Sequence, residues 1–135
     1  MKKKTKIFTQ NCGTYSDQIL VICGATKIET YAYLKKVKAN VDFTEWVLND
    51  FSDWENRTKK QNYALFCWHE EVEGCVLFLK PLKDSWEYWE TLMHECHHVT
   101  FHLAKKKMFQ DEIENQAYLF EYLFRSIRRK ICGLD

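Results

Sequence analysis

Apolar residues in the first half of the chain form one continuous run and then two stretches with helical spacing. The run QILVICG, residues 18–24, is typical of a short buried strand. Thr26, with Glu29 three residues later, has the form of a capping box, which predicts a helix from there to about residue 40. A second, short helix is predicted over FTEWVLNDF, residues 43–51, followed by a polar connector.

The second half contains two β-prone runs, YALFCWH at 63–69 and GCVLFLK at 74–80. The four residues EEVE separate them, which predicts a hairpin with glycine at the end of its turn. We therefore expect these two runs to pair with each other in a small sheet.

Two helices are predicted after the hairpin. Asp84 and Glu87 form a second capping-box pattern, so that a long helix is expected from about residue 85 to 107. An amphipathic helix is expected from Asp111 to about Ile131. The predicted order is one strand, two helices, a hairpin and two more helices, which is an α+β fold.

Length and charge limit what such a fold can do. A chain of 135 residues is enough for one domain, which we place at 1–135. Its 20 basic and 19 acidic side chains give a net charge of +1, which disfavours a nucleic-acid-binding role. The run ILVIC is far too short to span a membrane, and no apolar stretch follows the basic start of the chain as in a signal peptide. The six cysteines are irregularly spaced and are expected to be free, mostly buried thiols, so that we expect a cytoplasmic protein.

The most informative motif is HECHH at residues 94–98, which contains His-Glu-x-x-His. On a helix, His94 and His98 would lie on one face about 6 Å apart, so that both imidazoles can reach one metal ion. Glu95 is turned by ~100° from His94 and can reach a metal-bound water. The motif thus supplies two candidate ligands and a candidate general base.

Helical spacing separates these histidines from the apolar stripe of the same helix. With His94 at zero, His98 falls near ~40° and His102 near ~80°, whereas the apolar residues gather at roughly 140° to 260°. His102 lies ~12 Å along the helix from His94, so that we expect it to support the site or to be partly buried. His97 points to another face and is expected to be structural. The alternative is a row of solvated histidines without a metal.

A zinc ion that catalyses hydrolysis normally has a third protein ligand, which must come from another element. On the last helix the predicted apolar stripe consists of Ile113, Ala117, Phe120, Phe124, Ile127 and Ile131. Glu114 borders this stripe, and small Ala117 one turn later would allow another helix to approach closely. Glu114 is therefore the first choice for the third ligand, and Glu121 the second.

The segments LMHECHHVTFHL, 92–103, and EIENQAYLFEYL, 112–123, resemble those of the gluzincins, zinc peptidases with HExxH on one helix and a glutamate on the next. Within this group the chain looks like the minimal zincin-like proteins of bacteriophages and prophages, and more distantly it resembles the ImmA/IrrE metallopeptidases. The resemblance covers about residues 62–131 and implies a small zincin-like domain in the cytoplasm, that of the host if a phage encodes it. Tyr118 stands where larger gluzincins have an aspartate that orients a histidine ligand, so that this role is unassigned.

The resulting hypothesis is a zinc-dependent metallopeptidase or related amide hydrolase acting on a peptide or protein. Zn²⁺ would be held by His94, His98 and Glu114, and Glu95 would be the general base. Strand 63–69 or 75–79 would bind an extended peptide by edge pairing. Candidates for a transition-state donor are Tyr118, Tyr122 and His69.

Two rival hypotheses come from other residues. A catalytically silent metal-binding module would grip a host or phage protein, with Trp46, Trp54 and Trp68 as candidate anchors. A nucleic-acid-binding protein would use the basic groups at 2–6, 105–107 and 125–130.

Overall fold

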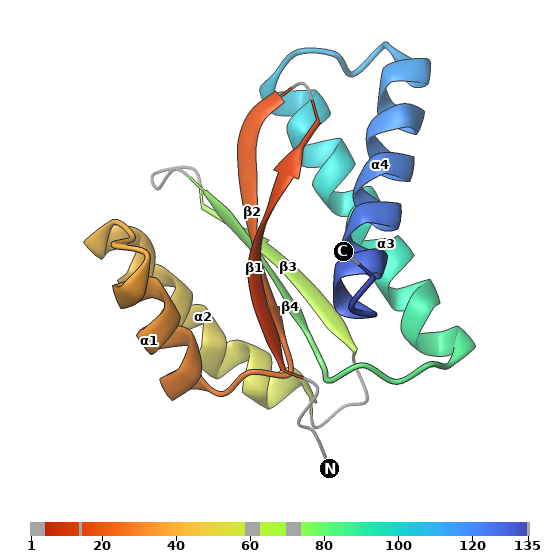
Figure 1. Cartoon of the computed structure of the whole chain (residues 1–135). Helices are drawn as coiled ribbons and strands as arrows, with labels where there is room; N and C mark the ends of the chain where they lie inside the picture. Colours follow the sequence, from red (N-terminus) through yellow and green to blue (C-terminus); the bar gives the residue numbers. More distant parts are fainter. Residues whose placement is uncertain (1–4, 14, 59–62, 70–73, 135) are drawn as a thin grey trace.

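The computed structural model in Figure 1 describes residues 5–13, 15–58, 63–69 and 74–134. In chain order its elements are β1 (Lys6–Cys12), β2 (Tyr15–Cys23), α1 (Lys27–Lys36), α2 (Val41–Thr58), β3 (Ala64–Trp68), β4 (Cys75–Leu79), α3 (Trp86–Lys106) and α4 (Ile113–Ile131). The predicted α+β class is confirmed. The predicted order lacked β1, since this strand reads KIFTQNC and has no apolar run.

The strands form one mixed sheet in the order β1-β2-β4-β3. β2 pairs antiparallel with β1 and parallel with β4, while β3 and β4 form the predicted antiparallel pair. The turn EEVE lies outside the described residues. Gly74 precedes β4 with φ +122°, and a Cβ there would lie 2.8 Å from the Phe43 ring, so that only glycine fits.

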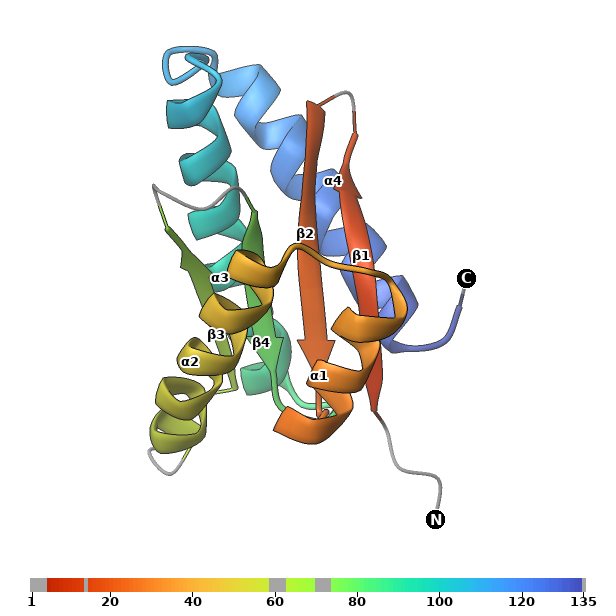
Figure 2. The ribbon, with the colours of Figure 1, turned by 90° about the vertical axis from the view of Figure 1, so that its left-hand side faces the viewer.

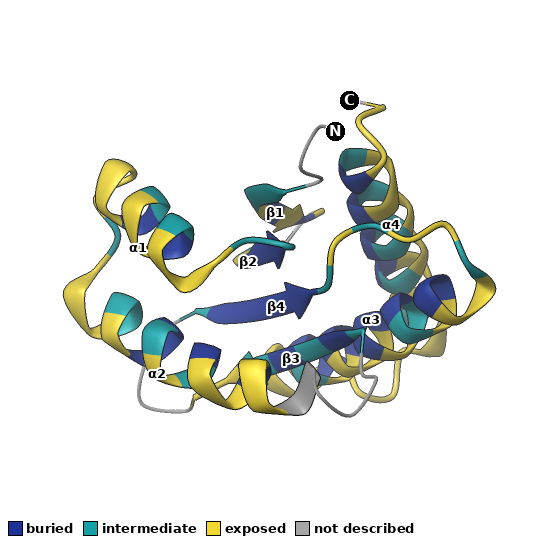
Figure 3. Ribbon diagram, turned by 90° about the horizontal axis from the view of Figure 1, so that it is seen from below, coloured by how far each residue is buried: buried dark blue, intermediate teal, exposed yellow. Residues whose placement is uncertain are grey.

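Two helices cover each face of the sheet, α1 and α2 on one side and α3 and α4 on the other (Figures 1 and 2). Figure 3 shows the buried residues of all four helices turned toward the sheet between them. All five residues of β4 are buried, which explains why the run CVLFL is continuously apolar. The molecule therefore has two hydrophobic clusters that share one sheet.

The cluster under α1 and α2 contains two of the three tryptophans that were proposed as anchors for a partner. Trp46 and Trp54 are only 7% and 5% exposed, and Trp54 stacks on Phe78 of β4. Their expected role as exposed anchors is therefore wrong, and of the three candidates Trp68 alone is exposed. The same burial explains why α2 continues to Thr58 through the predicted polar connector.

The helix starts show where local signals are sufficient. Both hydrogen bonds of the Thr26–Glu29 capping box are present, as predicted. The long helix instead has Ser85 as its N-cap, whose Oγ accepts a hydrogen bond from the backbone N–H of Tyr88 at 3.2 Å. Asp84, the predicted cap, accepts a bond from the Trp89 indole N–H at 2.9 Å, so that it fixes a side chain rather than the backbone.

The apolar stripe of α4 is turned relative to the predicted one. Its buried residues are Leu119, Leu123, Ile127 and Ile131, with Phe120 and Phe124 half-buried. Ile113 and Ala117 are exposed, contrary to prediction. The argument that placed Glu114 beside a buried stripe therefore fails, since Glu114 is exposed on the same side as Ala117.

Several basic groups proposed for nucleic acid take part in contacts within the fold. Lys106 and Lys107 pair with Asp17 at 2.8 and 2.9 Å, which ties the end of α3 to β2. Arg128 lies over the Trp89 ring, and Lys6 donates to the backbone of Lys130 at 2.6 Å. These contacts weaken the nucleic-acid hypothesis, while residues 2–4 lie outside the described part of the chain.

The expectation of free, mostly buried cysteines is confirmed, and the helices can be compared with the expectation of no membrane span. The six cysteines all lie within the described ranges, and none forms a disulfide; four are buried, whereas Cys67 is half-buried and Cys132 is exposed. Among the described residues, none of the helices is both long and apolar enough to cross a bilayer.

Candidate metal centre

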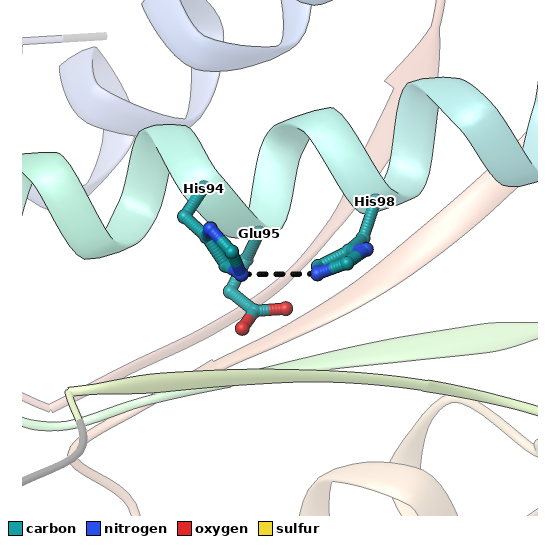
Figure 4. A group of neighbouring side chains, drawn as sticks. All are labelled: His94, Glu95 and His98. Carbon is teal, nitrogen blue, oxygen red and sulfur yellow. Dashed lines mark hydrogen bonds between the residues drawn. The ribbon is translucent and has the colours of Figure 1, made fainter.

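The structure brings together three residues of the HECHH motif on α3. Figure 4 shows His94, Glu95 and His98 leaving the helix on the side of the strands. The Nε2 atoms of the two histidines are 3.0 Å apart, and one ligand atom from each of the three residues lies within 4.8 Å of the others. Both imidazoles are exposed while Glu95 is only 8% exposed, so that the group opens to solvent on its histidine side.

The separation of the two nitrogens fits a zinc site. Two Zn–N bonds of about 2.05 Å at a tetrahedral angle place the nitrogens about 3.3 Å apart. The observed 3.0 Å needs only a small adjustment, since a metal ion would replace the hydrogen bond between the rings. Two imidazole nitrogens favour zinc over hard cations such as Mg²⁺ and Ca²⁺, and zinc also accepts a carboxylate oxygen.

Glu95 is held by the backbone of the neighbouring strand. The N–H of Phe66 donates a hydrogen bond to Glu95 Oε2 at 3.0 Å, and both groups are buried. A carboxylate in such surroundings needs hydrogen bonds to offset the loss of water. The bond therefore fixes one carboxylate oxygen against β3 and orients the group beside the two histidines.

The same bond shows which backbone groups β3 turns outward. The N–H of Lys80 donates to the carbonyl of Tyr63. In this register the backbone N–H and C=O groups of residues 63, 65 and 67 point toward β4. The backbone groups of Ala64, Phe66 and Trp68 then point away from the sheet, and the Phe66 N–H is the one that Glu95 accepts from. Of the two strands expected to bind a peptide, only β3 lies at an edge; β4 lies between β2 and β3, so that its edges are occupied.

The two other histidines of the cluster have the separate roles that their spacing predicted. His102 is half-buried against β3, with its ring centroid 5.8 Å from Phe66 and 5.0 Å from Trp68. Burial lowers the pKa of His102 below its ordinary value, and Lys106 lowers it further. His97 instead stacks on Phe120 of α4 with centroids 4.0 Å apart, which makes it a contact between helices.

Glu114 is not part of the His94, Glu95 and His98 group. The stacking of His97 on Phe120 and of Arg128 on Trp89 shows that α3 and α4 run antiparallel. Glu114 lies six residues before Phe120, about 9 Å back along α4 and toward the far end of α3 from His94. Its role as third ligand remains a prediction that this geometry does not favour, and Glu121 is exposed as well.

The candidate transition-state donors make contacts away from this group. The Tyr122 hydroxyl donates to the side-chain oxygen of Asn11 on β1. His69 lies against Trp46 and pairs with Asp50 at 3.4 Å, at the other face of the sheet. Tyr118 is exposed on α4. None of these contacts places a hydroxyl or an imidazole beside His94 and His98.

Sequence reasoning did not find the backbone partner of Glu95. A backbone N–H carries no residue signature, and only the placement of β3 alongside α3 makes that of Phe66 available. The predicted hairpin before the helix was the one signal pointing to this arrangement.

The chain matches no protein-family model, no curated protein and no solved structure.

Proposed function

We propose that this protein is a zinc-dependent hydrolase of peptide or related amide bonds. The observation that carries the proposal is the pair of exposed Nε2 atoms 3.0 Å apart, next to a buried carboxylate held at a sheet edge. His94 and His98 would hold the ion, which when bound acidifies a water molecule toward a pKa of ~7 and polarises a carbonyl.

Glu95 is the general base of the proposal. A base must be oriented toward the proton that it accepts, and the Phe66 N–H supplies this orientation through one carboxylate oxygen. The substrate is a peptide or protein in extended form. It would lie along β3, where the backbone groups of Ala64 and Trp68 point outward on either side of Phe66.

The third ligand is the open part of the proposal. Glu114, the choice from the sequence and from the zincin resemblance, would have to approach the histidines from its present place in the first turn of α4. Glu95 is the carboxylate that already lies next to them, and it would act as a ligand instead of a base if Glu114 stays away.

Two substitutions distinguish these roles. Glu95→Gln keeps a side-chain oxygen that can accept from the Phe66 N–H, and is expected to bind zinc like the wild type and to lose hydrolysis by a factor of about 100 or more. Glu114→Gln is the matched variant and is expected to weaken zinc binding if that carboxylate is a ligand. Both are measured by zinc titration and by mass-spectrometric detection of cleavage in a peptide mixture.

The results assign the carboxylates separately. Unchanged cleavage by Glu95→Gln would exclude the general-base role. Loss of zinc from Glu95→Gln, with Glu114→Gln unaffected, would make Glu95 the ligand.

The second candidate is a binding module whose metal serves the fold or a partner, without catalysis. The exposed ring of Trp68 at the sheet edge favours it, because an exposed tryptophan is a common anchor of protein interfaces. Zinc binding with no cleavage of any peptide by the wild type would favour this reading. In either case we place the protein in the cytoplasm, on the argument from its sequence.

A further inference from the structure

Trp68 is a large apolar side chain that the fold leaves half uncovered. It is the last residue of β3 and is 45% exposed. Its ring stacks on that of Phe66 at 5.4 Å, with 26° between the planes, and the two rings therefore lie on the α3 face of the sheet. Phe66 is buried, so that the uncovered surface of this aromatic pair belongs to Trp68.

His102 joins this pair to the candidate metal centre. Its ring lies 5.0 Å from Trp68 at an angle of 40°, and 5.8 Å from Phe66. His98 and His102 lie on successive turns along one side of α3, about 6 Å apart. Trp68 therefore flanks the histidines on the side of the C-terminal end of α3.

The side chains around Trp68 favour an apolar occupant. Burial and nearby Lys106 lower the pKa of His102 below its ordinary value, against a smaller opposite effect of Asp17, which favours the neutral form of the ring beside Trp68. An imidazole, an indole and a phenyl ring form a surface that gains contact area and ring stacking from a flat or bulky apolar side chain.

Register brings a peptide side chain to this surface. The backbone groups of Trp68 point outward from the edge, as derived from the Tyr63–Lys80 and Phe66–Glu95 hydrogen bonds. A peptide paired with β3 places alternate side chains on the α3 face, each opposite a β3 side chain. The peptide residue opposite Trp68 would thus meet the uncovered indole beside His102.

From this placement we infer that Trp68, with His102, selects substrates that carry an aromatic or large aliphatic residue next to the reacting bond. The inference rests on the proposed hydrolase function and adds the substrate class to it. Trp68 is a specificity-determining residue in this account, because it contacts the substrate side chain and not the reacting atoms.

The test uses the full-length, zinc-loaded chain and two amino-acid hydroxamates as probes, one with a benzyl and one with a methyl side chain. Hydroxamates bind zinc through the same group, so that a difference in affinity reports on the side chain. The benzyl compound is expected to bind the wild type about tenfold more tightly than the methyl compound. Calorimetry or competition against a fluorescent chelator measures both affinities and the zinc affinity.

Three variants locate the preference. Trp68→Ala is expected to reduce the tenfold preference to less than about threefold while zinc and the methyl compound bind as before. Trp68→Phe is expected to retain part of the preference and guards against a folding defect. Trp86→Ala is the matched control, because Trp86 is 70% exposed at the N-terminal end of α3, opposite the end that Trp68 flanks, and should change nothing.

Failure of the inference differs from failure of the proposed function. Equal affinities of the two probes for the zinc-loaded wild type, or an unchanged preference in Trp68→Ala, would overturn the inference alone. A wild type that binds no zinc would overturn the proposed function and this inference together.

Discussion

Glu95 is part of the packing between α3 and the sheet and is also a candidate for the chemistry of the site. It is a carboxylate buried between α3 and the sheet, and its position in the motif makes it the candidate base. Removing it entirely would leave the buried Phe66 N–H without this acceptor, at a cost of about 1–3 kcal/mol. Glutamine is therefore the informative substitution, since it tests the charge without removing the acceptor.

His102 makes the stability of the metal-free protein depend on pH. Because burial and Lys106 lower its pKa in the folded state below the ordinary 6.5, the unfolded chain takes up a proton first as the pH falls. The stability contribution of neutral His102 is complete above pH 6.5. It decreases as the pH falls below that value and stops changing below the folded-state pKa.

We therefore predict that His102→Gln loses less stability than the wild type between pH 7.5 and pH 5. Urea unfolding in the presence of a chelator measures this difference. Since His94, His97 and His98 remain in both proteins, they largely cancel. Parallel curves for the two proteins would contradict the assigned direction of the pKa shift.

At the scale of elements, the start of α3 fixes where the metal-binding face points. Ser85 caps the helix through the N–H of Tyr88, and Asp84 instead binds the Trp89 indole. We predict that Ser85→Ala lowers the free energy of unfolding by about 1 kcal/mol, whereas Ser85→Asp stays within a few tenths. Chemical denaturation measures both.

Asp84→Asn is the matched control for this cap. Its side-chain oxygen can still accept from Trp89, so that it should change stability little. No loss of stability in Ser85→Ala would contradict the assignment of Ser85 as the N-cap.

Elements with strong local signals could be predicted, and those defined by their neighbours could not. The capping box of α1, the β3–β4 pair and the HECHH helix follow from residues close together in the chain. β1 has few apolar residues because it is an edge strand, and only pairing with β2 reveals it. The predicted α4 stripe was right at Ile127 and Ile131 and wrong at Ile113 and Ala117. Aromatic residues on two sides of the helix allowed two orientations, and packing buried Leu119 and Leu123.

In the candidate site, the residues that share one helix could be predicted, whereas contacts between different elements could not. His94, Glu95 and His98 share one helix, so that spacing alone brings them together. Glu114 depended on how α4 faces α3, which the sequence does not determine. Two further features depend on the long-range contact between β3 and α3. They are the hydrogen bond from the Phe66 N–H to Glu95 and the ring contact between Trp68 and His102.

At the scale of the whole molecule, the sheet separates a structural side from a candidate functional side. The cluster under α1 and α2 buries Trp46 and Trp54, while the other face carries α3 with its exposed histidines. A ligand that binds only the folded state stabilises it by mass action, by about 2.7 kcal/mol at a concentration of 100 times Kd. Zinc should therefore raise the melting temperature of this chain, and a chelator should reverse the effect.

The most direct test of the account is the zinc content of the purified chain, measured by elemental analysis after dialysis against buffered zinc. We predict about one zinc per chain for the wild type and none for the His94→Ala/His98→Ala double variant. The double variant should also lose the rise in melting temperature on zinc addition while folding without it. Zinc near zero in the wild type, or equal zinc in both proteins, would contradict the account.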